Sequence, residues 1–268
     1  MNIENLTSLA ISACIYGGQE IMSVYNTDFD FELKKDNSPL TIADKKCNKK
    51  IEEILYDSKI PILSEEGKQL SYEERKNWKY LWIVDPLDGT KEFIKKNGEF
   101  TVNVALIKNN QPIVGVIYVP AKNILYFSNK NVGSYKSKVS INEFKDSASI
   151  KELITESEKL PIIKSSSKHI IVASRSHMSK ETQDFVESRR EIKKNIEIVS
   201  IGSSLKICMV AEGKADVYPR LAPTMEWDVA AGHSIAKYSG FNILNYENGT
   251  ELTYNKQNLL NPFFIVEW

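Results

Sequence analysis

Apolar positions near the start of the chain repeat at the spacing of a helix. The stripe consists of Leu6, Leu9, Ala10, Ala13, Cys14 and Gly17. This pattern predicts a first helix that faces the core. The stretch is apolar enough to resemble a signal peptide, but Glu4 and no Lys or Arg precedes it, which is the wrong charge for one. No apolar run approaches the length of a transmembrane span.

Residues 41–55 carry a second helical stripe. Its apolar members are Ala43, Cys47, Ile51, Ile54 and Leu55. Thr41, with Asp44 three residues later, resembles a capping box at the start of this helix. A second core-facing helix is therefore expected here.

Strands are predicted downstream by short apolar runs. One covers 60–63 and another covers 81–84. Residues 100–128 then read as an antiparallel meander, with turns at 109–110 and 120–123. This part of the chain is typical of an α+β fold with an antiparallel sheet.

The rhythm changes after a polar, weakly patterned segment at 136–168, which we interpret as the joint between two lobes. Beyond it, strands at 169–174, 196–202 and 215–220 each precede a helix, beginning near Ser179 and covering 203–213 and 227–240. Such alternation indicates an α/β lobe with a partly parallel sheet. We expect an α+β lobe at 1–140 and an α/β lobe at 141–268.

Composition narrows the classes of function. The chain has 268 residues, with 35 Lys+Arg and 35 Asp+Glu. This balance argues against binding to a nucleic-acid duplex or a membrane surface. Cys14, Cys47 and Cys208 are far apart and form no CxxC or Cys/His cluster, so a zinc site is not expected and a reducing, cytoplasmic location is favoured.

The stretch LWIVDPLDGTKEF joins an apolar strand to two carboxylates on either side of a proline. Pro86 restricts its own φ and favours an extended Asp85, so Asp85 and Asp88 can point to one side of a sharp turn. Gly89 permits close backbone approach, and Thr90 can begin a helix whose free amides favour an anion such as phosphate. A type I turn with Asp88 as a helix cap explains the same residues equally well.

Two further acidic positions extend this set. Glu65 and Glu66 end a strand that can lie beside the strand leading to Asp85, and only one of the two can face Asp85 because neighbouring strand residues point to opposite sides. Asp228 stands at the start of a helix, where the helix dipole alone also favours an acid. With Asp88, these residues would form an all-oxygen site that suits Mg²⁺ or Mn²⁺. Without a cation, the carboxylates would repel each other.

Several blocks of this sequence resemble those of the inositol monophosphatase superfamily of metal-dependent phosphatases. They are LSEEG, WIVDPLDGTKEFIKKNGEFTVNVALI, SRSH, IGSSLKICMVAEGKADVYPR and WDVAAGHSIAKYSG, in family order over nearly the whole chain. DGTKEF in place of DGTTNF, together with GSSLK, is most similar to the 3'(2'),5'-bisphosphate nucleotidases. The resemblance implies a layered α-β-α-β-α sandwich of the inositol monophosphatase and fructose-1,6-bisphosphatase type. The segment 136–168 matches no motif of the family.

The resemblance implies roles for the acids. Two to three Mg²⁺ ions, with Mn²⁺ possible, would be held by Glu65, Asp85, the backbone carbonyl of Leu87, Asp88 and Asp228. In the implied mechanism, Glu65 and Thr90 orient an attacking water and the amides of Gly89 and Thr90 hold the phosphate oxygens. Asp44 resembles the acid that pairs with Thr90, although an ordinary first-turn acid explains it as well.

The second half of the chain would supply the nucleotide contacts. By resemblance these are His177, Ser203, Lys206 and Arg220, with Asp228 beside the substrate. Other interpretations stay open: Ser203 can cap a helix, Lys206 can be a solvated helix residue, and His177 can be an ordinary loop residue. Arg220 ends a strand, where a guanidinium can bind phosphate through two hydrogen bonds.

The implied activity is Mg²⁺-dependent hydrolysis of adenosine 3',5'-bisphosphate to AMP and phosphate, in sulfur metabolism and with sensitivity to lithium. Inositol monophosphate or fructose 1,6-bisphosphate is an alternative substrate. A catalytically silent nucleotide or metal sensor is an alternative of another class, since fold alone does not fix function. The expected partner is a small nucleotide. The expected location is the cytoplasm, and loose peripheral association with the inner membrane through the first helix stays open.

Overall fold

The computed structural model describes most of the chain. The residues outside the description are 1, 26–30, 34–38, 69, 145–148, 163–167 and 174–178, and for 31–33 and 39–41 only the backbone is described. The described helices, 3-10 turns included, are α1 (Ile3–Tyr25), α2 (Ile42–Leu55), η1 (Tyr56–Ser58), α3 (Tyr72–Arg75), α4 (Thr90–Ile94), η2 (Pro120–Lys122), α5 (Ile150–Thr155), α6 (Lys180–Ile192), α7 (Leu205–Ala211) and α8 (Glu226–Tyr238). None of the helices in this part of the chain is long and apolar enough to cross a bilayer.

A seven-stranded sheet forms the centre of the first half. Its strands lie in the order β3 (Ile62–Ser64), β4 (Tyr80–Asp88), β5 (Thr101–Lys108), β6 (Gln111–Val119), β7 (Ile124–Asn129), β8 (Gly133–Lys138) and β9 (Glu158–Lys159). All neighbours are antiparallel except β3 and β4, which run parallel. The parallel pair brings the carboxyl ends of β3 and β4 to the same edge of the sheet.

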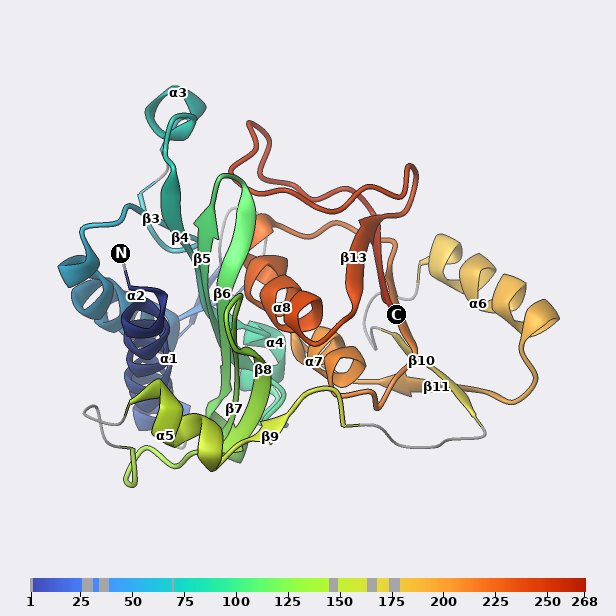
Figure 1. Ribbon diagram of the computed structural model, residues 1–268, viewed down its shortest axis with the longest axis horizontal. Helices are drawn as coiled ribbons and strands as arrows, with labels where there is room; N and C mark the ends of the chain where they lie inside the picture. Colours follow the sequence, from blue (N-terminus) through green and yellow to red (C-terminus); the bar gives the residue numbers. More distant parts are fainter. Residues whose placement is uncertain are drawn as a thin grey trace.

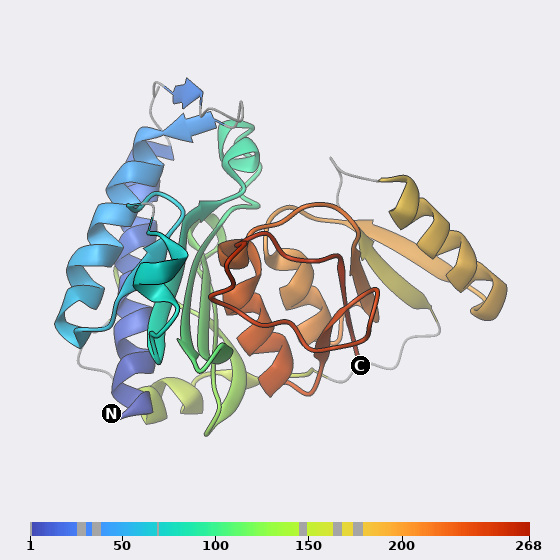
Figure 2. The same ribbon diagram turned by 90° about the horizontal axis from the view of Figure 1, so that it is seen from above.

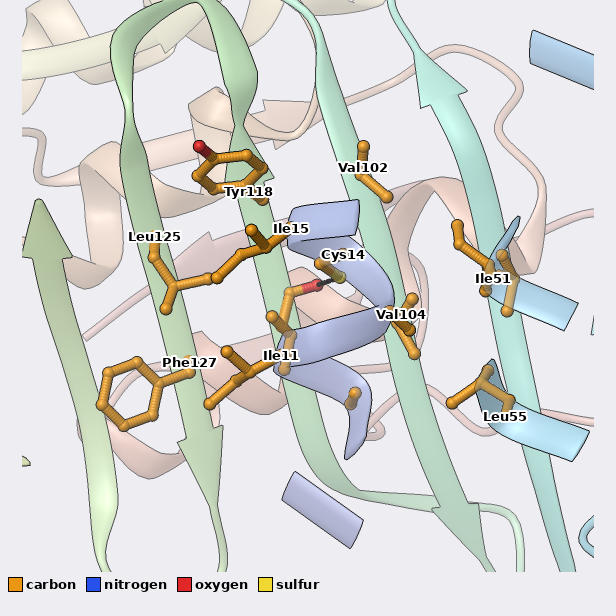
Figure 3. Packing of buried hydrophobic residues seen from close by; sticks show 14 of the residues in the cluster. Ile11, Cys14, Ile15, Ile51, Leu55, Val102, Val104, Tyr118, Leu125 and Phe127 are labelled. Atoms are coloured by element: carbon orange, nitrogen blue, oxygen red, sulfur yellow. Dashed lines mark hydrogen bonds between the residues drawn. The ribbon is translucent and has the colours of Figure 1, made fainter. Parts of the chain in front are cut away.

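Helices α1 and α2 cover one face of this sheet, as their apolar stripes predict (Figure 1). Figure 3 shows Ile11 and Ile15 of α1 directed at Leu125 and Phe127 of β7. Most of the stripe of α1 and of α2 is fully buried, so both helix predictions are confirmed. Burial of such side chains is worth about 1.5–3 kcal/mol each relative to exposure, so this layer helps to anchor the site-bearing strands, together with α8, which packs on β4 and β5.

A second, five-stranded sheet has the order β11 (Ile196–Ser200), β10 (His169–Ala173), β12 (Val217–Arg220), β14 (Phe264–Glu267) and β13 (Asn242–Asn245). The strands β11, β10 and β12 run parallel, and β14 and β13 are antiparallel to their neighbours. Helices α7 and α8 lie between the two sheets and α6 lies on the outer face (Figures 1 and 2). The layers are therefore α-β-α-β-α, and the predicted fold class is confirmed.

Several local predictions differ from the structure. The strand predicted at 60–63 is β3, shifted two residues at its start and one at its end. The segment 136–168 is not without structure, because it contains the end of β8, helix α5 and strand β9. Helix α5 begins with a capping box in which Ser149 and Glu152 satisfy each other's backbone amides, a sequence signal that the polar composition obscured. The pair β1 (Phe31–Leu33) and β2 (Pro39–Thr41), together with β13 and β14, was not predicted.

Candidate metal and phosphate site

Three acidic side chains from three different elements meet beside the end of β4. A carboxylate oxygen from each of Glu65, Asp85 and Asp228 lies within 4.8 Å of the others. The register of the strands explains the first pair: Ser64 is opposite Val84, and the amide of Glu65 donates to the carbonyl of Val84 at 3.1 Å. Glu65 therefore lies beside Asp85, and the first of the two adjacent glutamates joins the cluster.

The DPLD turn shapes the end of β4. The pairing of β4 with β5 is regular up to Asp85 and resumes at Asp88, with a register shift between them. Asp85 accepts a hydrogen bond at 3.1 Å from the amide of Leu87, across Pro86. The apolar side chain of Leu87 is buried in the core below, and its carbonyl accepts from the hydroxyl of Thr90 at 3.4 Å. The irregularity lets two carboxylates leave one strand end on the same side.

The electrostatics of this cluster are unfavourable for the protein alone. Burial raises the pKa of Asp85 well above its usual range, and the charges of Glu65, Asp88, Asp228 and Asp44 raise it further. Burial and the charge of Asp88 raise the pKa of Asp228 to about 7, although the Met225 amide, which donates to Asp228 at 2.8 Å, opposes the rise. Close carboxylates with these pKa values are stabilised by a bound cation.

The donor set fits a hard divalent ion. The cluster offers carboxylate oxygens and neither a His nor a Cys ligand among the described residues. Mg²⁺ and Mn²⁺ prefer such oxygen ligands, whereas zinc sites in proteins use His and Cys. The sequence-based choice of metal therefore agrees with the geometry, and the number of ions stays a prediction.

Asp88 lies at the wall between this cluster and a pocket. Its Oδ2 atom accepts hydrogen bonds from the amide of Ser204 at 2.5 Å and from the Ser204 hydroxyl at 2.7 Å. Asp88 is not one of the three residues within 4.8 Å of one another, but its charge raises the pKa of both Asp85 and Asp228. It is thus near the cluster and anchored to the second half of the chain.

Gly89 and Thr90 begin the short helix α4 directly after these acids. Gly89 has φ 91°, a left-handed backbone that favours glycine. A β-carbon there would lie 3.1 Å from the carbonyl oxygen of Glu99 and 3.2 Å from the side chain of Ser203, so the turn also packs closely against the loop before α7. The φ of Gly89 sets the direction in which the chain enters α4.

Asp44 is buried in the first turn of α2. Its charge raises the pKa of Asp85, which places it near the cluster. The side chain of Thr41, its suggested capping partner, lies outside the described residues. Pairing of Asp44 with Thr90 stays a prediction.

A pocket of about 160 Å³ adjoins the acids. Its wall contains six of the residues singled out from the sequence: Asp88, Gly89, Ser203, Lys206, Arg220 and Asp228. Segments from both halves of the chain thus meet at one pocket, which both cationic and acidic side chains line. His177 lies outside the described residues, so its predicted contact stays a prediction.

Lys206 is buried in this wall rather than solvated. Its ammonium group donates to the carbonyl of Ser203 at 2.6 Å and lies 5.8 Å from the centre of the Tyr218 ring. Burial lowers the pKa of Lys206 to about 8, while the charge of Asp88 opposes the fall. The side chain therefore stays largely cationic at neutral pH and fixes the loop that carries Ser203.

Ser203 and Arg220 complete the pocket. Ser203 has φ 50°, unusual for a residue with a side chain, and its hydroxyl lies 3.3 Å from that of Thr101. The N-cap of α7 is Ser204, so the capping interpretation of Ser203 is wrong. Arg220 donates to the carbonyl of Pro223 at 2.9 Å, and its buried Nε has no hydrogen-bond partner among the described residues.

Sequence reasoning missed the polar residues behind Asp88. Thr101 and Asn103 are buried in β5, and Asn103 donates to the Ser204 hydroxyl at 2.9 Å. The available signal was two polar residues at alternate positions of an apolar strand, which place both side chains on one face. Glu99 was also missed; its carboxylate accepts from the amide of Gly202 at 2.9 Å.

Comparisons with known proteins agree over nearly the full chain. A model of the inositol monophosphatase family matches residues 2–262. The 3'(2'),5'-bisphosphate nucleotidase CysQ of Shigella flexneri is 40% identical over 254 residues, covering 93% of this chain and 94% of that protein. CysQ of Haemophilus influenzae is 31% identical and covers 98% of this chain and 93% of its own.

Two solved structures extend the comparison. The crystal structure of CysQ from Bacteroides thetaiotaomicron, described as a bacterial member of the inositol monophosphatase family, matches with a TM-score of 0.92 and 48% identity, covering 98% of this chain and 97% of that one. The extragenic suppressor protein suhB of Bartonella henselae has a TM-score of 0.73 at 20% identity, covers 98% of this chain and 93% of its own, and so shares the fold.

Proposed function

Because the chain belongs to the inositol monophosphatase family, a family of metal-dependent phosphatases, we propose that its acidic cluster and the adjoining pocket form the active site of a 3'(2'),5'-bisphosphate nucleotidase. The reaction is hydrolysis of adenosine 3',5'-bisphosphate to AMP and phosphate. The observation that carries the proposal is that three carboxylates lie within 4.8 Å of one another, next to a pocket lined by Lys206 and Arg220. Names of the similar proteins support the choice of substrate.

The acids would hold the metal. Glu65, Asp85 and Asp228 offer oxygens to a common centre, and Asp88 and the carbonyl of Leu87 would complete a site for two to three Mg²⁺ ions, or Mn²⁺ in their place. Bound Mg²⁺ would supply neutralisation of the phosphate charge and a lower pKa for the attacking water. Each carboxylate must be ionised to bind the metal. The negative charges that repel one another in the metal-free protein would then attract the cation.

The residues around the acids would arrange the reactants. Glu65 would accept a hydrogen bond from the attacking water, and Thr90, with Asp44 behind it, would orient that water toward the phosphorus. The amides of Gly89 and Thr90 would donate to phosphate oxygens. Holding a water and a phosphate in one geometry reduces the entropic part of the barrier. No serine, cysteine or histidine nucleophile is needed in this scheme.

The second half of the chain would bind the rest of the nucleotide. Lys206 and Arg220 would supply positive charge at the wall of the pocket. Ser203 would donate its hydroxyl to the ligand and His177 would contact the adenosine or its 5'-phosphate. Asp228 would lie beside the bond that breaks. A guanidinium recognises phosphate through paired hydrogen bonds, which favours Arg220 as the specificity contact.

The wider proposal keeps the remaining expectations from the sequence. The halves 1–140 and 141–268 would act as two lobes, with strand β9 of the second half completing the first sheet. A cytoplasmic location and a place in sulfur metabolism follow from the family resemblance. The partner would be a small bisphosphate nucleotide and not a nucleic-acid duplex.

A substrate panel tests this function. Phosphate release is measured with adenosine 3',5'-bisphosphate, inositol monophosphate and fructose 1,6-bisphosphate, each with Mg²⁺, with Mg²⁺ plus Li⁺, and with EDTA. The proposal predicts release from the nucleotide that requires Mg²⁺ and falls with Li⁺. Preference for inositol monophosphate or the sugar bisphosphate would refute the substrate, and tight nucleotide binding without release at any Mg²⁺ concentration would identify a sensor.

A further inference from the structure

Asp88 is held by one residue from the second half of the chain. The amide and the hydroxyl of Ser204 both reach the Oδ2 atom of Asp88, at 2.5 and 2.7 Å. The described residues give no hydrogen bond to the other oxygen, Oδ1. The Ser204 hydroxyl also lies 3.0 Å from the backbone carbonyl of Asp228. Ser204 therefore contacts both β4, which carries Asp88, and α8, which carries Asp228, although it belongs to neither element.

A chain of buried polar groups lies behind Ser204. The hydroxyl of Thr101 donates to the amide oxygen of Asn103 at 2.9 Å, and the amide nitrogen of Asn103 donates to the Ser204 hydroxyl oxygen at 2.9 Å. Thr101 is opposite Asp88 and Asn103 is opposite Asp85 in the pairing of β4 with β5. The strand that pairs with the acids thus also carries their polar support.

The direction of these hydrogen bonds follows from their order. The side-chain oxygen of Asn103 accepts a hydrogen bond from Thr101, so the side-chain nitrogen of Asn103 faces Ser204. The hydroxyl oxygen of Ser204 accepts a hydrogen bond from that nitrogen, so the hydroxyl proton of Ser204 must point toward another acceptor. The nearest acceptor is Oδ2 of Asp88. Every donor in the chain from Thr101 onward therefore points toward this carboxylate, which favours one orientation of the Asp88 side chain.

We propose that Ser204, supported by Asn103 and Thr101, is a positioning residue that fixes the carboxylate of Asp88 with Oδ1 free for the divalent ion. This inference rests on the proposed function, since it assumes that Asp88 contributes to the metal site. Groups that hydrogen-bond to metal-binding carboxylates typically set metal affinity without touching the metal. Ser204 is the N-cap of α7, so its bond to Asp88 also couples the start of α7 to the metal site.

The experiment measures Mg²⁺ binding to the full chain by titration calorimetry, without nucleotide. Ser204→Ala removes the hydroxyl and keeps the backbone amide. We expect its Mg²⁺ dissociation constant to rise by about 10- to 100-fold. Asn103→Ala, which leaves Ser204 in place but removes its support, should shift the constant in the same direction by a smaller factor. Hydrolysis should need more Mg²⁺ for half-maximal rate, with kcat at saturating Mg²⁺ within about three-fold of the wild type.

Ser234→Ala is the matched control. Ser234 is a buried serine in α8, six residues after Asp228, and its hydroxyl lies 2.8 Å from that of Ser128 rather than beside an acid of the cluster. Its removal should lower the thermal stability in EDTA and leave Mg²⁺ affinity unchanged. Wild-type affinity in both Ser204→Ala and Asn103→Ala, or an equal loss in Ser234→Ala, would overturn the positioning role. A wild-type chain that binds Mg²⁺ but does not hydrolyse the nucleotide would refute the proposed reaction and leave the positioning result intact.

Discussion

Asp228 offers a test in which the sign of the stability change depends on the metal. The substitution Asp228→Asn keeps the size of the side chain and an oxygen that can accept from the Met225 amide, 2.8 Å away in the wild type. It removes one negative charge from a cluster in which neighbouring carboxylates raise the pKa of Asp85 and of Asp228. In EDTA near neutral pH, we therefore expect the variant to be more stable than the wild type.

The magnitude follows from the pKa of Asp228. Its rise from 3.8 to about 7 corresponds to roughly 4 kcal/mol at 1.36 kcal/mol per pH unit. Because the side chain is partly exposed and water relaxes around it, we expect about half of this, on the order of 2 kcal/mol.

The sign with pH is fixed by proton binding. Below pH 3.8 both the folded and the unfolded chain carry the proton, and no difference is expected. Between 3.8 and about 7 the folded chain retains a proton that the unfolded chain has lost, so the unfolding free energy of the wild type falls as pH rises through this window. The variant lacks the part of this dependence that comes from Asp228, while the buried Asp85 keeps a raised pKa.

Mg²⁺ should reverse the order. A ligand that binds only the folded state at 100 times its dissociation constant adds about 2.7 kcal/mol to the unfolding free energy. The wild type should gain this and the variant should gain little. The assay is urea denaturation at several pH values, with EDTA or with Mg²⁺.

Glu66→Gln is the control for this test. Glu66 follows Glu65 directly but is not part of the group of three acids. It should keep both the pH dependence and the response to Mg²⁺ of the wild type. Two results together would refute this account: equal unfolding free energies of Asp228→Asn and wild type in EDTA at about pH 8, and an equal increase of both with Mg²⁺. They would show that the Asp228 carboxylate neither destabilises the metal-free protein nor binds the cation.

Three further substitutions address other parts of the account. Gly202→Ala would bring a β-carbon to 2.7 Å from the side chain of Glu92, so we expect a loss of about 1–3 kcal/mol in urea denaturation and a raised KM; unchanged values would show that the loop before α7 adapts freely. Arg220→Lys keeps the charge but loses the planar donors, so KM for adenosine 3',5'-bisphosphate should rise about ten-fold, while KM for adenosine 3'-monophosphate should change little. An equal rise of KM for both nucleotides would show that Arg220 does not recognise the 5'-phosphate. Lys136 lies 2.9 Å from Glu212, and Glu212→Ala would remove this buried partner. The substitution should lower the unfolding free energy from thermal denaturation by roughly 3 kcal/mol and leave Mg²⁺ affinity unchanged. An unchanged unfolding free energy would show that this link between α7 and the first sheet does not stabilise the protein.

The position of the acids could be predicted because local patterns determine it. Two parallel strands that end at the same edge place Glu65 beside Asp85, and a proline turn places Asp88 nearby. Both inferences need only strand alternation and the restricted φ of proline. The helix stripes around Cys14 and Cys47 were equally local, and both helices are present.

The support of the acids could not be predicted, because it depends on contacts distant in sequence. Ser204 reaches Asp88 across 116 positions and Asn103 reaches Ser204 across 101. A polar residue in an apolar strand signals a buried hydrogen bond without identifying its partner. The strand pair β13 and β14 was missed for the same reason, since its place in the second sheet depends on pairing with β12.

The central claim is that separate segments of the chain gather carboxylates to hold a divalent cation for phosphate hydrolysis. Anomalous diffraction from crystals grown with Mn²⁺ tests it most directly, because the peak locates the ion itself. The account predicts an anomalous peak between Glu65, Asp85 and Asp228, within bonding distance of about 2–2.3 Å of their oxygens. Crystals that diffract well and show no peak there, or that show the ion bound only elsewhere, would contradict it.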